Sequence, residues 1–300
     1  MSIFADEDTK LLIQGITGRA ASEKTPHMIE YGTDVVAGVT PGKGGQEVAG
    51  VPVYDTVREA VEEHPEINTS LIYVPHFAAK DAVLEALNSG IKNINITTER
   101  IPTRDMWELR EELEKQEATL VGPTSVGVIS PGKAKVGPIG GNKAEQAYEK
   151  GSIGIISKSG GMTTETAQVV QNAGFGISTA MDIGGDKIAG TTFVEALQMF
   201  EEDNQTDAVV IFGELGGTYE NQVAQYLDDN PDLDLPVVAF ITGKFTENMP
   251  TQQYGHAGAV IRKGQDKPSH KEKVLREAGA HVVEVHHEIG SKLDEVLSTE

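Results

Sequence analysis

The stretch KLLIQGITGRAASEKTPHMIEYGTDVVAGVT, residues 10–40, decides the fold class. Two short apolar runs, at 10–17 and 34–40, bracket a segment in which glycines lead into a helix expected to begin near Arg19. Parallel strands need a crossover between them, and a helix is the usual one. The stretch therefore predicts an α/β fold built on a parallel sheet with helices on its faces.

The same alternation of strand and helix continues along the chain in two blocks. Apolar runs follow at 70–75, 92–97 and 118–122, and then at 152–157, 177–184, 208–214, 236–243 and 281–286. The intervening residues, 123–151, are rich in Gly and Pro, which is typical of a crossover linker. We expect a Rossmann-like domain over 1–122, a linker over 123–151 and a flavodoxin-like domain over 152–300, with about five strands in each domain.

The composition narrows the class of protein. The 300-residue chain contains no cysteine, which excludes disulfides, a thiolate nucleophile and zinc–thiolate sites. No apolar run approaches the roughly 18 residues that cross a bilayer, so no membrane association is predicted. The acidic start MSIFADEDTK lacks the basic region of a signal peptide. We expect a cytoplasmic protein, or one of the mitochondrial matrix if a transit peptide has been removed.

The formal net charge is -21, from 46 acidic and 25 basic residues. Nucleic-acid binding needs a basic face, so a nucleic-acid partner is excluded. The acidity fits a high-salt habitat and equally fits an ordinary soluble acidic protein. An anionic substrate would have to be attracted by local positive groups, which directs attention to glycine-rich turns that carry Lys or Arg.

Two loops of the first domain have the composition of a phosphate site. Gly15 and Gly18 flank Thr17 after the first strand, with a spacing that differs from the G-x-G-x-x-G dinucleotide fingerprint. The second strand runs into TPGKGG (40–45), which places Lys43 where a nicotinamide-binding fold carries an acid. The alternative is a pair of ordinary turns with a solvated lysine. Together the loops favour a phosphorylated adenosine ligand such as coenzyme A and argue against an NAD-dependent oxidoreductase.

The second domain opens with a candidate anion site in SKSGGMTTETA (157–167). Ser159, Gly160 and Gly161 precede a helix whose expected start is Thr163 or Thr164 with Glu165. The free N–H groups of a helix start attract anions when small residues precede it. The alternative is a plain capped helix.

An acid and a histidine follow two further strands. Glu214, in GELGG (213–217), is placed to orient an imidazole, although it could also be a helix cap. His256, in GHAGA (255–259), is flanked by glycines that leave room for a group to bond to it. His286 and His287 do not predict a metal site, because adjacent side chains on a strand point to opposite faces. We expect no bound metal on this chain.

Six motifs in order, TPGKGG, TERIPTRDM (98–106), SKSGGMT (157–163), DIGGDKIAG (182–190), GELGG and GHAGA, together resemble the alpha subunit of succinate–CoA ligase. This family belongs to the superfamily of NDP-forming acyl-CoA synthetases and ATP-citrate lyase, and the resemblance covers essentially the whole chain. It implies that His256 is phosphorylated during turnover and that Glu214 orients it. It also implies that Ser159, Gly160 and Gly161 hold the phosphoryl group. The residues implied to bind CoA are Thr17, Gly18, Arg19, Ala20, Lys43, Thr97, Thr98 and Glu99.

The resemblance further implies a reversible reaction of the citric acid cycle. A small dicarboxylate, CoA and ATP or GTP would give acyl-CoA, the nucleoside diphosphate and phosphate through an acyl phosphate. A partner beta subunit with an ATP-grasp fold would bind Mg2+ and the nucleotide, in an αβ or α2β2 assembly. Many bacterial members have an aromatic residue at the position of Thr164, a candidate contact of the acid, so citrate and malate stay open beside succinate. A non-catalytic CoA- or nucleotide-binding sensor is the alternative from another class.

Overall fold

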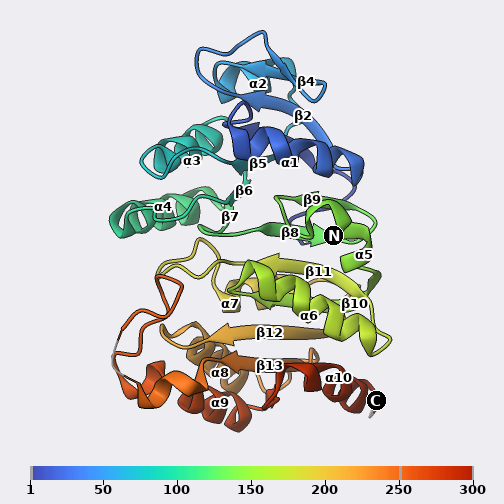
Figure 1. Cartoon of the computed structure of the whole chain (residues 1–300), viewed down its shortest axis with the longest axis vertical. Coiled ribbons are helices and arrows are strands. Elements are labelled where there is room, and N and C mark those ends of the chain that lie inside the picture. The colour runs from blue at the N-terminus through green and yellow to red at the C-terminus, as the bar shows by residue number, and fades with distance from the viewer. Residues whose placement is uncertain (1–2, 250–251, 299–300) are drawn as a thin grey trace.

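The computed structural model describes residues 3–249 and 252–298. Two sheets lie one above the other along the long axis of the molecule, with the N-terminal half at the top of Figure 1 and the C-terminal half at the bottom. Helices cover both sheets. The α/β class predicted from residues 10–40 is confirmed, and the arrangement agrees with a Rossmann-like part followed by a flavodoxin-like part.

The first sheet has seven strands. They are β1 (Lys10–Gln14), β2 (Asp34–Val39), β3 (Glu47–Val48), β4 (Val51–Tyr54), β5 (Thr69–Ile72), β6 (Asn93–Ile96) and β7 (Thr119–Val121). The order is β3-β4-β2-β1-β5-β6-β7, and every pairing is parallel except β3 with β4. The crossover helices are α1 (Arg19–Glu30), α2 (Val57–Glu63), α3 (Ala79–Asn88) and α4 (Thr103–Gln116). Helix α1 begins at Arg19, as predicted.

The second sheet also has seven strands. They are β8 (Gly127–Ser130), β9 (Ala134–Val136), β10 (Lys150–Ser157), β11 (Ile177–Asp182), β12 (Ala208–Glu214), β13 (Val237–Thr242) and β14 (His281–Val282), in the order β14-β13-β12-β10-β11-β8-β9. Its helices are α5 (Ala144–Ala147), α6 (Gly160–Asn172), α7 (Phe193–Glu201), α8 (Tyr219–Asp229), α9 (Pro268–Glu277) and α10 (Ile289–Leu297). Short 3-10 turns lie at Gly141–Lys143, Lys244–Asn248, Gly264–Asp266 and His286–Glu288.

The central strands are buried on both faces, which explains why they appear as continuous apolar runs. Leu11, Leu12 and Ile13 of β1 have no exposed surface, and all seven residues of β12 are buried. Since a parallel sheet brings the carboxyl ends of its strands to one edge, the loops after these strands are where side chains from distant sequence positions meet.

Residues 123–151, predicted to be a linker, form part of the second sheet. Strands β8 and β9 form a hairpin, and β8 pairs antiparallel with β11, so this segment extends the second sheet. In Figure 1 the hairpin lies between the two halves. The segment also contacts the first domain, because Thr33 Oγ1 donates to the carbonyl of Lys135 at 2.9 Å. These short strands were not predicted, because the Gly- and Pro-rich composition of the segment is typical of loops.

Two other expectations about strands were wrong. Each sheet has seven strands rather than about five, because β3, β4, β8 and β9 are only two to four residues long and carry too little periodicity to predict. The strand expected over 281–286 ends at Val282, and His286 begins a 3-10 turn instead.

The two halves are joined by direct contacts between α4 and the start of α7. Both guanidinium nitrogens of Arg110 bind the carboxylate of Glu195, at 2.7 and 3.0 Å, and Arg110 also donates to the carbonyl of Gly190. Thr191 Oγ1 donates to the carbonyl of Leu120 at 2.9 Å. These contacts fix the position of the loop 183–192 against the first domain.

Across residues 3–249 and 252–298, no helix combines the length and the apolar character that crossing a membrane requires.

Candidate functional site

His256 and Glu214 form a hydrogen-bonded pair at the edge of the second sheet. Glu214 is the last residue of β12, and its Oε2 lies 2.8 Å from Nδ1 of His256. The Glu214 side chain is 8% exposed, whereas that of His256 is 32% exposed. The hydrogen bond to Glu214 raises the pKa of His256, although burial acts in the opposite direction. A neutral ring whose Nδ1–H donates a hydrogen bond to Glu214 presents Nε2 as the nucleophile.

Glycines of three motifs make room for the histidine loop. A methyl group added to Gly185 would lie 2.3 Å from Cγ of His256, so only glycine allows the ring to pack there. A methyl on Gly216 would lie 2.3 Å from the carbonyl oxygen of Gly258. The N–H of Gly258 donates to the carbonyl of Gly185 at 3.0 Å. The motifs GGD, GELGG and GHAGA are therefore one packed unit in the fold.

A cluster of buried charges supports Glu214 from behind. Lys271 Nζ donates to the Glu214 carbonyl at 2.8 Å and to Glu220 Oε2 at 2.5 Å. Lys158 Nζ lies 3.7 Å from Glu214 Oε1 and 3.5 Å from Glu220 Oε1. Burial opposes the ionisation of Glu220, yet Lys158 and Lys271 hold its pKa below the ordinary value. Paired in this way, the charges fix the end of β12 and the carboxylate that binds His256.

Helix α6 starts earlier than predicted. Its first residue is Gly160 and its N-cap is Ser159, so Thr163 and Glu165 lie inside the helix rather than at its start. Ser159 makes no side-chain cap. Its backbone is held by Ser157 Oγ and by Thr163 Oγ1, both of which donate to its carbonyl. The N–H groups of the first turn are thus not satisfied by a side-chain cap, as an anion site requires.

Asp182 connects this helix start to the histidine. Its carboxylate accepts hydrogen bonds from the N–H groups of Val126 and Gly184, at 2.8 and 3.1 Å. A methyl group on Gly160 would lie 3.3 Å from Asp182 Oδ2. Burial raises the pKa of Asp182 to about 7, while the nearby His256 lowers it. The two groups are therefore electrostatically coupled.

The predicted CoA residues of the first loops lie together at the carboxyl edge of the first sheet. Gly18 caps α1 without a side chain, so the N–H groups of Arg19 and Ala20 are at the open end of the helix. Thr17 Oγ1 donates to Thr40 Oγ1 at 3.2 Å, which holds the first loop against the second. Lys43 is exposed in the second loop, as its prediction as a phosphate ligand requires.

Thr97, Thr98 and Glu99 follow β6 at the same edge. Thr97 and Thr98 donate to the carbonyls of Ile72 and Val74, at 3.1 and 2.6 Å. Burial raises the pKa of Asp186, a residue of the second half, and the charge of Glu99 adds to this rise. Arg100, the next residue, lines the same cavity as Asp186. This segment therefore brings the edge of the first sheet to the loop that packs on His256.

A cavity of about 310 Å³ lies at this junction. Arg100, Ile101 and Met106 line it from the first half, and Lys187 and Ala257 line it from the second. Ala257 is the neighbour of His256. The cavity therefore lies between the segment that follows the predicted CoA residues 97–99 and the histidine loop.

Thr164 lies on the first turns of α6, and its hydroxyl is 2.9 Å from that of Tyr148. It is partly exposed, so a substrate can reach it. His286 is partly buried: its Nε2 lies 2.9 Å from Thr166 Oγ1, and Phe212 and Phe240 pack against its ring. Within the described residues no group of three or more His, Cys, Asp and Glu is arranged to hold a metal.

The sequence analysis missed the residues that position His256 and Glu214. They are Lys158, Asp182, Gly185, Glu220 and Lys271. Charged residues in an acidic chain are normally exposed, so no pattern distinguishes the buried ones. Gly185 was part of a quoted motif, but only the fold reveals which side chain it accommodates.

Two protein-family models match this chain. The CoA binding domain matches residues 6–100, and the CoA-ligase domain matches residues 156–284. The alpha subunit of ADP-forming succinate–CoA ligase from Aquifex aeolicus is 44% identical over 299 residues, covering 99% of this chain and 95% of the relative. The ADP-forming sulfoacetate–CoA ligase subunit SqwL of an Acholeplasma species is 42% identical, covering 99% of this chain and 98% of the relative.

Solved structures show the same fold at lower identity. ATP citrate lyase from Methanothrix soehngenii, in complex with citrate and coenzyme A, superposes with a TM-score of 0.90 at 24% identity. The similarity covers 99% of this chain but 51% of that one, so this chain spans about half of the lyase. This likeness concerns the arrangement of both halves and not the substrate.

Proposed function

The chain belongs to the CoA-ligase family that includes the alpha subunits of succinate–CoA ligase, and we propose that it is the alpha subunit of an ADP-forming succinate–CoA ligase. The single observation that carries this proposal is the Glu214–His256 pair, which lies beside a cavity that reaches the CoA-binding half. Such a pair has the composition of a phosphoryl acceptor with an orienting acid.

We infer a reaction in three steps that this chain's residues support. Nε2 of His256 takes the terminal phosphoryl group of ATP, and ADP leaves. A carboxylate oxygen of succinate then attacks the phosphorus, which breaks the N–P bond and gives an acyl phosphate. The thiolate of CoA attacks the acyl carbon, and phosphate leaves as the acyl-CoA forms. The start of α6 at Gly160 and Gly161 would stabilise the phosphate charge in the second and third steps.

Glu214 has two roles in this scheme. It fixes the ring tautomer by accepting a hydrogen bond from Nδ1–H, and it stabilises positive charge that develops on the ring when Nε2 bonds to phosphorus. The buried Lys158 and Lys271 hold Glu214 in position. Each lysine also binds Glu220, so its positive charge is shared with a second carboxylate.

CoA would lie along the carboxyl edge of the first sheet. The open N-terminus of α1 and Lys43 suit its phosphates. Thr97, Thr98 and Glu99 directly precede Arg100, which lines the cavity that Ala257 of the histidine loop also lines. The domain boundaries proposed for this division of labour are 1–122 and 152–300, with the hairpin of 123–151 packed between them.

A partner subunit completes the proposal. Relatives named as alpha subunits imply one, and we infer that it has an ATP-grasp fold and binds Mg2+ and the nucleotide. The ADP-forming names of the relatives favour ATP over GTP. Relatives from bacteria and archaea favour the cytoplasm over the mitochondrial matrix.

The acid substrate is the part of the proposal that most needs a direct test. The purified complex of both subunits would be given ATP, CoA and, in turn, succinate, sulfoacetate, malate and citrate, while acyl-CoA and phosphate are measured. We expect succinate to give the highest kcat/KM. Turnover of another acid alone would replace succinate but keep the ligase, and no acyl-CoA with any acid would overturn the proposed function.

A further inference from the structure

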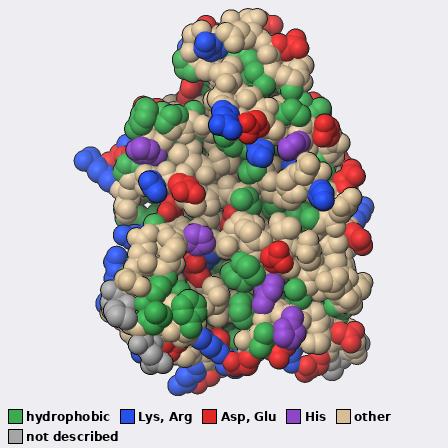
Figure 2. All heavy atoms as spheres, viewed as in Figure 1, with side chains coloured by type: hydrophobic (Ala, Val, Ile, Leu, Met, Phe, Trp, Pro, Cys, Tyr) green, Lys and Arg blue, Asp and Glu red, His purple; other side chains and the backbone are tan. Residues whose placement is uncertain are grey.

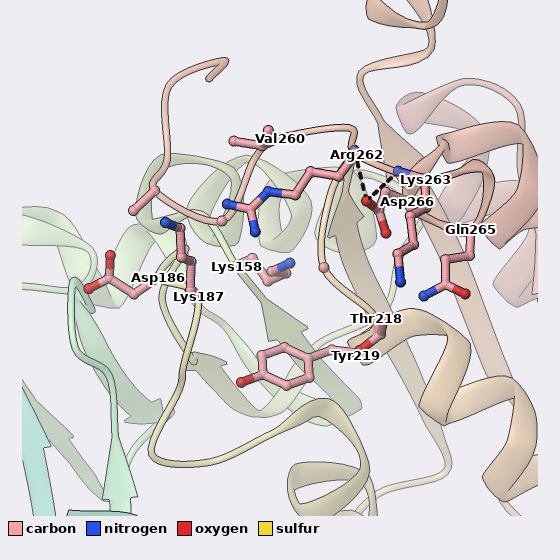
Figure 3. A pocket seen from close by; sticks show the side chains of 13 residues that line it. Lys158, Asp186, Lys187, Thr218, Tyr219, Val260, Arg262, Lys263, Gln265 and Asp266 are labelled. Carbon is pink, nitrogen blue, oxygen red and sulfur yellow. Dashed lines mark hydrogen bonds between the residues drawn. The ribbon is translucent and has the colours of Figure 1, made fainter. Parts of the chain in front are cut away.

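A second cavity, with a volume of about 300 Å³, also borders the histidine loop and shares Asp186, Lys187 and Ala257 with the first cavity. Ala257 and Gly258, which directly follow His256, form part of its wall. Lys158, Lys187, Arg262 and Lys263 line it from three different parts of the second half. Figure 3 shows the guanidinium of Arg262 above Lys158, with Lys187 beside them. Ser159, Gly160 and Gly161 do not line this cavity, so it differs from the predicted phosphate site.

Lys158 is paired with Glu214 and Glu220, whereas the other three cations of this cavity form no ion pair within the described residues. Within the described ranges, no carboxylate oxygen lies within 4.0 Å of the charged nitrogens of Lys187, Arg262 or Lys263. Both acids in the wall accept hydrogen bonds from other groups, although the charge of Lys187 partly opposes the rise in the pKa of Asp186 that burial causes. Asp266 accepts from the N–H groups of Arg262 and Lys263, and Asp186 accepts from Thr124. In a chain of net charge -21, unpaired cations that converge on one cavity are an exception that an anion would explain.

Backbone groups add to the positive character of the cavity. Gly217, Thr218 and Tyr219 line it at the start of α8, and Thr218 makes no side-chain cap. The N–H of Gly216, just before this turn, donates to the carbonyl of Asp266 at 2.8 Å, which holds the start of α8 against the segment that carries Arg262 and Lys263. The helix start therefore faces the same space as the cations.

We propose that this cavity is a second phosphate-binding site, in which Arg262 and Lys187 hold a phosphate group next to the histidine loop. Arginine binds two phosphate oxygens at once, and a phosphate dianion relieves the repulsion among the cations. The inference deepens the proposed function and rests on it for the source of the phosphate, which is either free phosphate or the terminal phosphate of the nucleotide. Figure 2 shows several Lys and Arg side chains along the left edge of the molecule.

Equilibrium binding to the two-subunit complex tests this proposal. His256→Asn serves as the background, because it prevents covalent incorporation of phosphate. In this background, Arg262→Ala with Lys187→Ala is compared with Arg58→Ala with Lys273→Ala, which removes the same charges at positions 82% and 70% exposed outside the cavity. The probes are labelled inorganic phosphate and a non-hydrolysable ATP analogue, measured separately, with thermal unfolding as a check on folding.

We expect the cavity pair to raise the Kd of one probe by on the order of tenfold, with little change in the control pair. A weakened affinity for inorganic phosphate identifies free phosphate as the ligand, and a weakened affinity for the analogue identifies the nucleotide. Unchanged affinity for both probes in folded complexes overturns the site. Failure of the proposed function is recognised separately, because it would leave wild-type His256 without label from ATP.

Discussion

Gly185 provides the sharpest prediction about the geometry of the site. A methyl group at this position would lie 2.3 Å from Cγ and 2.4 Å from Nδ1 of His256. Carbon atoms in contact lie about 3.5 Å apart, so Gly185→Ala requires the ring to move by roughly 1.2 Å. The backbone of Gly185 does not have positive φ, so the substitution adds no strain of its own.

The displacement would break the bond to Glu214. That bond is 2.8 Å long, and a shift of this size takes it past the range in which hydrogen bonds are effective. A misplacement of about 1 Å at a reacting group costs on the order of 100-fold in rate. We therefore expect Gly185→Ala to slow phosphorylation of His256 by about 100-fold.

The assay is single-turnover transfer of label from the terminal phosphate of ATP to the assembled complex. Gly264→Ala is the matched control, because no atom lies within 4 Å of a methyl group at that glycine and its φ is not positive. Thermal unfolding of both variants separates a local effect from misfolding. A folded Gly185→Ala complex that labels at the wild-type rate would refute the packing argument.

Three further predictions concern charge. Glu214 raises the pKa of His256, and the neutral ring is the nucleophile, so the initial labelling rate should rise as pH increases through the raised pKa. Glu214→Gln should move that rise to lower pH. A pH profile that does not move in this variant would contradict the role of Glu214. Lys271→Met leaves the buried Glu220 with one cation fewer and should lower the free energy of unfolding by about 3–5 kcal/mol in denaturant titrations. Adding Glu220→Gln should restore part of this loss. An unchanged free energy of unfolding in Lys271→Met would show that the cluster is not stabilising. Arg110→Ala removes a half-exposed ion pair between the halves and should cost only about 1 kcal/mol by the same method, so a much larger loss would mean that the halves depend on this contact.

The alternation of strand and helix was enough to predict both parallel sheets, because buried parallel strands appear as apolar runs whatever their partners are. Strand β4 was missed because Pro52 interrupts a run of four residues, and β8 because Gly127 and the surrounding prolines resemble a linker. The direct contact between Glu214 and His256 is consistent with the expectation that both follow neighbouring strands of one sheet.

The buried charged residues that hold Glu214 in position could not be predicted from the sequence alone. Whether Lys158 and Lys271 are buried depends on pairing with Glu220, which lies some 50 or more positions away in the chain from either lysine. Arg262 and Lys187 were likewise unremarkable, because a single exposed cation has no periodicity and only the fold brings the two to one cavity.

The central claim is that His256 carries the phosphoryl group, and its direct test is labelling of the two-subunit complex with ATP labelled at the terminal phosphate. The account predicts label on the wild-type chain that is stable in base, labile in acid and located on the peptide containing His256. His256→Asn should remove it. Absence of label on the folded wild-type complex, or equal labelling of His256→Asn, would contradict the account.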